Sequence, residues 1–142
     1  MKTDLNNAKT LLEALNCTCV LCAGAQFHSS HHRGVKPLLD FLDSGSDFRG
    51  FCAADRVVGK ATAFLYLLLG VTAVHAQVMS KAAERVFLRE GIAYSYDRLV
   101  DAIQNRDHTG PCPMEYATRD TEDPHLALAA IRQALQQLRQ TP

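Results

Sequence analysis

The sequence predicts a single α/β domain over residues 1–142, folded as a three-layer α/β/α sandwich around a mixed sheet of about five strands. From residue 50 onwards, short apolar runs alternate with amphipathic segments, which is the pattern of parallel strands joined by right-handed helical crossovers. Before residue 50, two strand-like runs flank a turn at Gly24, which predicts an antiparallel hairpin at one edge of the sheet. A chain of 142 residues that is 47% hydrophobic can bury one core of this size.

The first part of the chain is predicted to form a helix, the hairpin and a second helix. Residues 5–15 repeat leucine and alanine at helical spacing. Residues 17–22 are rich in strand formers, and residues 26–30 form the expected return strand, with Phe27 as its large apolar residue. The stretch 35–45 reads VKPLLDFLDSG, in which the proline suits a first helical turn and the last glycine suits the helix end.

The second part is predicted to alternate strands and helices. The expected elements are a strand at 50–54, a helix to Leu69, a strand at 71–79, a helix from Ser80 to Gly91, a strand at 92–96, a helix from Asp97 to Ile103, a loop with one helical turn, and a last helix from Pro124. Ser80 and Asp97 are predicted as helix caps because their side chains can accept a hydrogen bond from a backbone N–H of the first turn.

Charge and composition exclude several classes of partner. Lys plus Arg and Asp plus Glu both number 15 without a block of like charge, so nucleic acid is not an expected partner. Residues 1–16 contain Asp4 and Glu13 and no continuous apolar run, which argues against a secretory signal. The run 61–74 is too short to span a bilayer, so we expect no membrane partner and a cytoplasmic location. The odd number of cysteines, five, favours thiols over a disulfide framework.

The stretch FCAADRVVGKATA resembles a phosphate-binding loop only in part. It lacks the first glycine and the hydroxyl residue of the P-loop pattern, and Val57 and Val58 are stiff where that loop bends. What remains is Asp55 at the expected carboxyl end of a strand and Lys60 at the start of the next helix, where ligands of α/β proteins bind. Lys60 is therefore either an anion anchor or a solvent-exposed lysine that pairs with Asp55 or another carboxylate.

Four stretches over roughly residues 5–138 resemble a small family of uncharacterised bacterial and archaeal proteins with a cytidine deaminase-like fold. They are RGVKPLLDFLD, AADRVVGKATA, VMSKAAERVFLREGI and NRDHTGPCPMEYATRDTEDP, and the pair DRVVGKA and GxCPME is the most specific. Zinc deaminases carry their metal ligands and catalytic glutamate at two helix starts. The helix starts VVGKATA and MSKAAER lack those ligands, so we predict no metal and no cofactor and disfavour hydrolytic deamination.

The resemblance implies a pocket at these two helix starts, under the loop that carries the GxCPME motif. The candidate catalytic residues are Cys112, Asp55 and Glu115, and the candidate ligand-binding residues are Lys60, Ser80 and Lys81. A lysine or helix N-terminus near Cys112 would lower the pKa of its thiol, which would make it a nucleophile. Glu115, Asp55 or His108 would then act as acid or base. The alternative is that Cys112 is an inert thiol in a tight loop.

Two classes of function remain open at this point. The first is a cysteine-dependent group transfer or hydrolysis on a small nucleotide-like or anionic metabolite. The second is non-catalytic binding of a small nucleotide-like ligand, or a regulatory module built on such binding. The sequence leaves open whether the protein is an enzyme and whether it forms a homo-oligomer.

Three further patterns are predicted to be structural rather than functional. In CxCxxC, alternation sends Cys17 and Cys19 to one face of a strand and Cys22 to the other, so we expect small buried residues. HSSHH at 28–32 is expected to be polar surface. His75, inside an apolar strand, is expected to be a buried histidine with satisfied hydrogen bonds.

Overall fold

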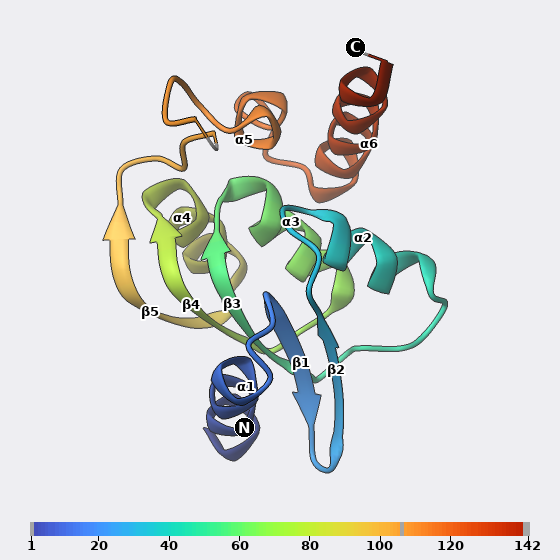
Figure 1. Cartoon of the computed structure of the whole chain (residues 1–142), viewed down its shortest axis with the longest axis vertical. Helices are drawn as coiled ribbons and strands as arrows, with labels where there is room; N and C mark the ends of the chain where they lie inside the picture. The colour runs from blue at the N-terminus through green and yellow to red at the C-terminus, as the bar shows by residue number, and fades with distance from the viewer. Residues whose placement is uncertain (1, 106, 141–142) are drawn as a thin grey trace.

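The computed structural model describes residues 2–105 and 107–140 and shows an open five-stranded sheet with helices on both sides (Figure 1). The strands are β1 Cys19–Ala23, β2 Gln26–Ser30, β3 Cys52–Val58, β4 Ala73–Ser80 and β5 Ala93–Val100, in the spatial order β2-β1-β3-β4-β5. Strands β3, β4 and β5 run parallel, and β1 is antiparallel to both β2 and β3. The predicted mixed sheet with an antiparallel hairpin at one side is therefore confirmed.

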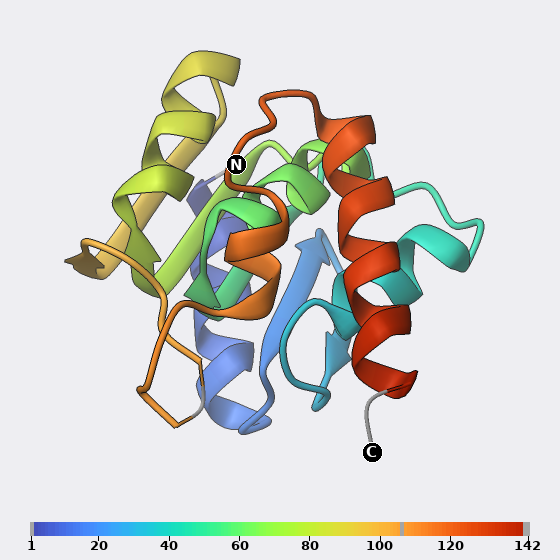
Figure 2. The ribbon, with the colours of Figure 1, turned by 90° about the horizontal axis from the view of Figure 1, so that it is seen from above.

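The helices form layers on the two faces of the sheet. They are α1 Lys2–Ala14, α2 Lys36–Asp43, α3 Lys60–Leu69, α4 Lys81–Glu90, α5 Pro113–Ala117 and α6 Pro124–Gln140. Helix α1 packs on one face against β1, β3 and β4, and α2, α3 and α4 cover the other face. Helix α6 lies against α3, and α5 contacts both α3 and α6. The last two helices therefore lie outside the layer formed by α2, α3 and α4 (Figure 2).

Strict alternation along the central strands divides the core in two. Ala54 faces α1 together with Val20, whereas Ala53 faces the larger core under α3 together with Leu21. Cys17 and Cys22 lie in the core beneath α1, and Cys19 lies in the other core. The expectation that Cys17 and Cys19 lie on the same face of the sheet is therefore wrong. Cys17 precedes β1 and does not follow its alternation. All three side chains are buried, as expected for small apolar residues.

Two predicted element boundaries are wrong, and in both places a strand is longer than expected. The predicted helix from Asp97 is the second half of β5, because Arg98, Leu99 and Val100 pair with successive residues of β4. Strand β3 continues to Val58, so Asp55 lies inside the strand rather than at its end. Pairing with β4 extends both strands beyond their predicted ends.

The helix ends follow the sequence signals closely. The Ser80 hydroxyl accepts a hydrogen bond from the Ala83 N–H at 3.1 Å, which confirms the predicted cap of α4. Gly70 and Gly91 end α3 and α4 with left-handed backbone angles, φ 81° and 71°. Arg106, within the NRDHTGPCPME stretch, lies outside the described residues. In the part of the chain that is described, no helix has the length and hydrophobicity needed to cross a bilayer.

Candidate functional site

A cavity of about 350 Å³ lies on the α3 side of the sheet, beside the outer end of β3. Its walls come from the start of β1, from β3, from the segment before α2 and the start of α2, from the start of α3, from Ile103 and from Cys112, Met114 and Glu115. Cys112, Asp55 and Glu115 all line it, although they are far apart in the chain. The structure therefore brings the three predicted catalytic residues to one cavity, which is the arrangement a shared site requires.

Asp55 is held in the cavity wall by two hydrogen bonds. Its carboxylate accepts one from the Tyr66 hydroxyl at 2.6 Å and one from the Val57 N–H at 3.2 Å. Its neighbour Arg56 points to the opposite face, where it donates to the Leu12 carbonyl. Burial raises the pKa of the Asp55 carboxyl to about 6, against the lowering effect of the Tyr66 hydrogen bond. Among the described residues, no cationic side chain forms an ion pair with Asp55.

Tyr66 and Cys19 join Asp55 beside the cavity, and neither was predicted as a site residue. Tyr66 is completely buried in α3, and burial raises its pKa, as does the neighbouring Asp55. Burial also raises the pKa of the Cys19 thiol, which shares a hydrogen bond with Tyr66. The available signal was a tyrosine in the middle of the apolar run FLYLLL, because a buried phenol needs a polar partner.

The mouth of the cavity carries positive charge. His32 and Arg33, in the segment before α2, line the cavity and are exposed. Among the described residues, Arg33 has no ion-pair partner, so its guanidinium is available to an anionic group. Most of the remaining surface is apolar and includes Val35, Leu38 and Met114. The cavity thus has an acid on one wall, a cation at the mouth and apolar surface between them.

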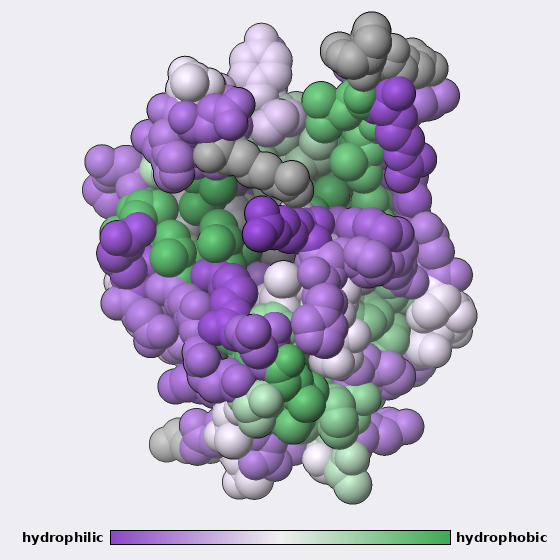
Figure 3. Space-filling model, in the orientation of Figure 1, coloured by the Kyte–Doolittle hydropathy of each residue, from purple (hydrophilic) through white to green (hydrophobic). Residues whose placement is uncertain are grey.

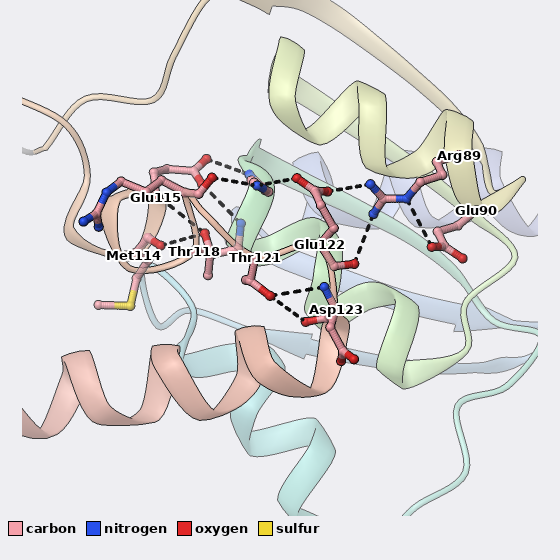
Figure 4. A network of polar contacts seen from close by, with 11 residues as sticks. Arg89, Glu90, Met114, Glu115, Thr118, Thr121, Glu122 and Asp123 are labelled. Atoms are coloured by element: carbon pink, nitrogen blue, oxygen red, sulfur yellow. Dashed lines mark hydrogen bonds and ion pairs between the residues drawn. The ribbon is translucent and has the colours of Figure 1, made fainter.

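Glu115 caps helix α3 from a distant part of the chain. Its two carboxylate oxygens accept hydrogen bonds from the N–H groups of Lys60 at 2.7 Å and Ala61 at 3.2 Å (Figure 4). The residue before the helix, Gly59, has no side chain to do this, and a Cβ atom there would overlap a Glu115 oxygen. Burial raises the pKa of the Glu115 carboxyl, while the two N–H groups and the Lys60 charge lower it.

Lys60 is buried, with 8% of its surface exposed, and is turned towards the segment between α5 and α6. Its ammonium donates to the Arg119 carbonyl at 3.1 Å and pairs with Glu122 at 3.0 Å. Glu122 also pairs with Arg89 of α4 (Figure 4), and these two cations lower the pKa of its carboxyl, Arg89 more strongly. The expectation that Lys60 pairs with a carboxylate is confirmed by Glu122. The expectation that Lys60 is exposed to solvent is wrong, because later chain covers the helix start.

The two residues predicted from the second helix start also have structural contacts. Ser80 is buried and caps α4, and Lys81 is exposed and pairs with Asp101 at 2.7 Å. The residues described as lining the cavity include neither of them, nor Lys60. The predicted ligand-binding roles of these three residues stay predictions. The observed contacts of each residue stabilise the fold.

The histidines are distributed over separate environments. His28 packs edge-on against Phe48, with ring centroids 5.0 Å apart. His75 is buried and bonds to Ser95 at 2.7 Å, which fits the expected satisfied histidine. His108 is exposed and bonds to Gln104. Within residues 2–105 and 107–140, no three His, Cys, Asp or Glu side chains are arranged to hold a metal ion.

Comparison with known proteins identifies the family. The model of the TM1506 family, described as a domain of unknown function (DUF1893), matches residues 7–135. The chain belongs to this family. Its structure is similar to the crystal structure of a DUF1893 family protein, TM1506 from Thermotoga maritima, with 27% sequence identity and a TM-score of 0.83 over 96% of this chain and 91% of that chain. A comparison with curated proteins gives no match. The expected membership of an uncharacterised family is thus confirmed, and a function for this DUF1893 member has to be argued from its cavity.

Proposed function

We propose that the protein binds a small nucleotide-like ligand in this cavity and that Asp55 recognises it. The observation that carries the proposal is that Asp55 lies half-buried in the cavity wall and has no ion-pair partner among the described residues. A carboxylate in such a place costs folding free energy, and the cost is normally offset by an ion pair or by function. A ligand that offers N–H groups to Asp55 would supply the missing partners.

The rest of the cavity supports a ligand with two chemically different ends. A flat ring would pack against Val35, Leu38 and Met114, and its N–H groups would reach Asp55. A phosphate or other anionic group would lie at the mouth, where Arg33 can bind it with two parallel hydrogen bonds. A volume of about 350 Å³ lies within the range of small-molecule pockets.

We also propose that the protein has the deaminase-like fold and the cytoplasmic location that the sequence predicts. In open α/β sheets, ligands bind outside the carboxyl ends of parallel strands. The cavity lies against Val57 and Gly59, where β3 passes into α3, and this placement supports a ligand site of that kind. A homo-oligomer would not change the proposal, because the cavity lining comes from one chain.

NMR titration of the full chain with the common nucleoside monophosphates tests this proposal. We expect at least one nucleotide to shift the amide signals of Val57, Gly59 and Met114, and inorganic phosphate alone to shift them much less. Asp55→Asn should weaken binding about tenfold or more, because the amide loses one acceptor. Asp40→Asn, on the exposed surface of α2, is the matched control and should bind like the wild type. The proposal is wrong if no nucleotide shifts these amides, or if Asp55→Asn binds as tightly as the wild type.

A cysteine-dependent reaction is the second candidate, and one observation favours it. Cys112 is half-buried on the wall of the same cavity as Asp55 and Glu115. In such a reaction the Cys112 sulfur would bond to an electrophilic atom of the ligand as the leaving group departs, and the thiol proton would pass to one of the two carboxylates. Cys112→Ser separates the candidates, since it should abolish turnover under this one and leave nucleotide affinity unchanged under simple binding. Intact masses of native and denatured protein would also reveal an adduct on Cys112.

A further inference from the structure

Residues 112–122 lie between two open spaces. On the inner side, Cys112, Met114 and Glu115 line the cavity described above. On the outer side, a groove of about 510 Å³ separates α5 from α6, and its lining includes Pro113 and Tyr116. Figure 3 shows that the side of α6 towards this groove is largely apolar. The part of the segment from Cys112 to Tyr116 is therefore a wall with space on both sides.

The contacts that hold this segment to the body lie at the start of α3 and on Arg89 of α4, which pairs with Glu122. The Glu115 carboxylate accepts hydrogen bonds from the first two N–H groups of α3, those of Lys60 and Ala61. The Lys60 ammonium holds the end of the segment through the Arg119 carbonyl and Glu122. Two side chains of the segment are buried: Met114, which belongs to the main core, and Thr118, which is 0% exposed. The ties made by Glu115 and Glu122 are polar and end on Lys60 and Ala61 of α3 and on Arg89 of α4 (Figure 4).

Polar ties of this kind can be exchanged for water at low cost. The first N–H groups of a helix have no partner within the helix, so water can satisfy them when Glu115 leaves. The Glu115 carboxylate is likewise well solvated once it is exposed. By contrast, a segment held mainly by buried apolar side chains would have to expose them to water on opening.

We propose that residues 112–122 form a lid over the cavity, latched by Glu115 on the first N–H groups of α3, and that ligand entry requires this latch to release. The inference rests on the proposed ligand site, whose access it regulates. Movement of the lid outwards would use the groove beside α6 and would expose Cys112 to solvent.

Gly59 offers a direct way to break the latch without removing any functional group. In Gly59→Ala the new Cβ atom would occupy the position of a Glu115 oxygen, so the carboxylate must move away. The backbone at Gly59, with φ −102° and ψ −174°, suits alanine, so the substitution adds no backbone strain. Gly110→Ala is the matched control, since nothing lies within 4 Å of the added atom there.

The test measures two properties of the full chain without ligand: hydrogen exchange at the amides of Lys60 and Ala61, and alkylation of Cys112 by iodoacetamide. In Gly59→Ala we expect about tenfold or faster exchange at both amides and faster alkylation, and wild-type behaviour in Gly110→Ala. Should Gly59→Ala fail to fold, Glu115→Gln carries the same test, because its amide nitrogen replaces one of the two accepting oxygens and cannot accept a hydrogen bond. The proposal would be overturned if Gly59→Ala or Glu115→Gln folds and yet shows wild-type exchange at the Lys60 and Ala61 amides and a wild-type rate of Cys112 alkylation.

Stopped-flow binding of the nucleotide found in the titration separates failure of the lid from failure of the ligand site. We expect faster association with Gly59→Ala than with the wild type, because the latch no longer limits entry. Equal association rates, with the latch shown to be broken, would overturn the lid and leave the ligand site intact. Faster exchange and alkylation in a chain that binds no nucleotide would support the lid and overturn the proposed function alone.

Discussion

Replacing Asp55 by asparagine should make the protein more stable above neutral pH while weakening its ligand site. The pKa of Asp55 is raised from 3.8 to about 6 in the folded protein, because burial opposes the charged form. Between about pH 4 and 6, Asp55 is therefore protonated in the folded state but ionised in the unfolded state. The wild type loses stability as the pH rises through this range, because folding there requires the uptake of a proton. A shift of about two pKa units corresponds to about 3 kcal/mol at most, less whatever water in the cavity recovers by solvating the charge.

Urea unfolding of both proteins at a series of pH values from 4 to 8 measures this effect. The free energy of unfolding of Asp55→Asn minus that of the wild type should rise by about 2 to 3 kcal/mol between pH 4 and pH 8. Asp47→Asn is the control, because the exposed Asp47 has a pKa lowered to about 2 by Arg49 and is ionised over the whole range. Its difference from the wild type should stay flat. A flat difference for Asp55→Asn as well would refute the reasoning, since Asp55 would then titrate as it does in the unfolded chain.

The remaining predictions concern neighbours of the same site. Iodoacetamide should label native protein at Cys112, while the other four cysteines, which are buried, should stay unlabelled until the protein is unfolded. Mass mapping that finds another cysteine labelled first would contradict this burial. Arg56→Met should lower the free energy of unfolding in urea by about 1 to 3 kcal/mol, because the Cys17 carbonyl loses its Arg56 donor and the Leu12 carbonyl is left with its hydrogen bonds from Cys17, whereas Arg49→Met, at an exposed pair, should cost under about 1 kcal/mol. Equal costs would argue against these contacts. Tyr66→Phe removes the hydroxyl that stabilises ionised Asp55, so the pH range over which stability falls should move upwards in the same urea series, and an unchanged range would show that this hydrogen bond is absent in solution.

The order of elements could be read from the sequence because its signals are local. Apolar runs, Ser80 as a cap, and Gly70 and Gly91 as helix ends all act within a few residues. The failure at Asp97 has a different cause. An aspartate followed by apolar residues is a good local signal for a helix start, but hydrogen bonding of residues 98–100 to β4 outweighs it. No pattern inside that segment reports that a neighbouring strand is long enough to pair with it.

The candidate site could be predicted from two sources. The expected end of a strand led to Asp55 and the resemblance led to Cys112 and Glu115, and the structure places all three around one cavity. The mistake at Lys60 arose because its carboxylate partner is Glu122, which lies 62 residues away in the chain. The capping of α3 by Glu115, over 55 residues, is equally invisible to a local pattern. Long-range contacts of this kind depend on how the last part of the chain closes over α3.

The close approach of Gly59 and Glu115 restricts how sequences of this family can diverge. A side chain at position 59 needs the space that the Glu115 carboxylate occupies, so a relative that loses the glycine must shorten or withdraw the acidic residue. The first N–H groups of α3 then need a new acceptor, which serine, threonine, aspartate or asparagine at position 59 would provide. We therefore expect the two positions to covary, with glycine accompanying glutamate and a capping residue accompanying a non-acidic one. An alignment of relatives would then report, through paired substitutions alone, which of them close the cavity in this way.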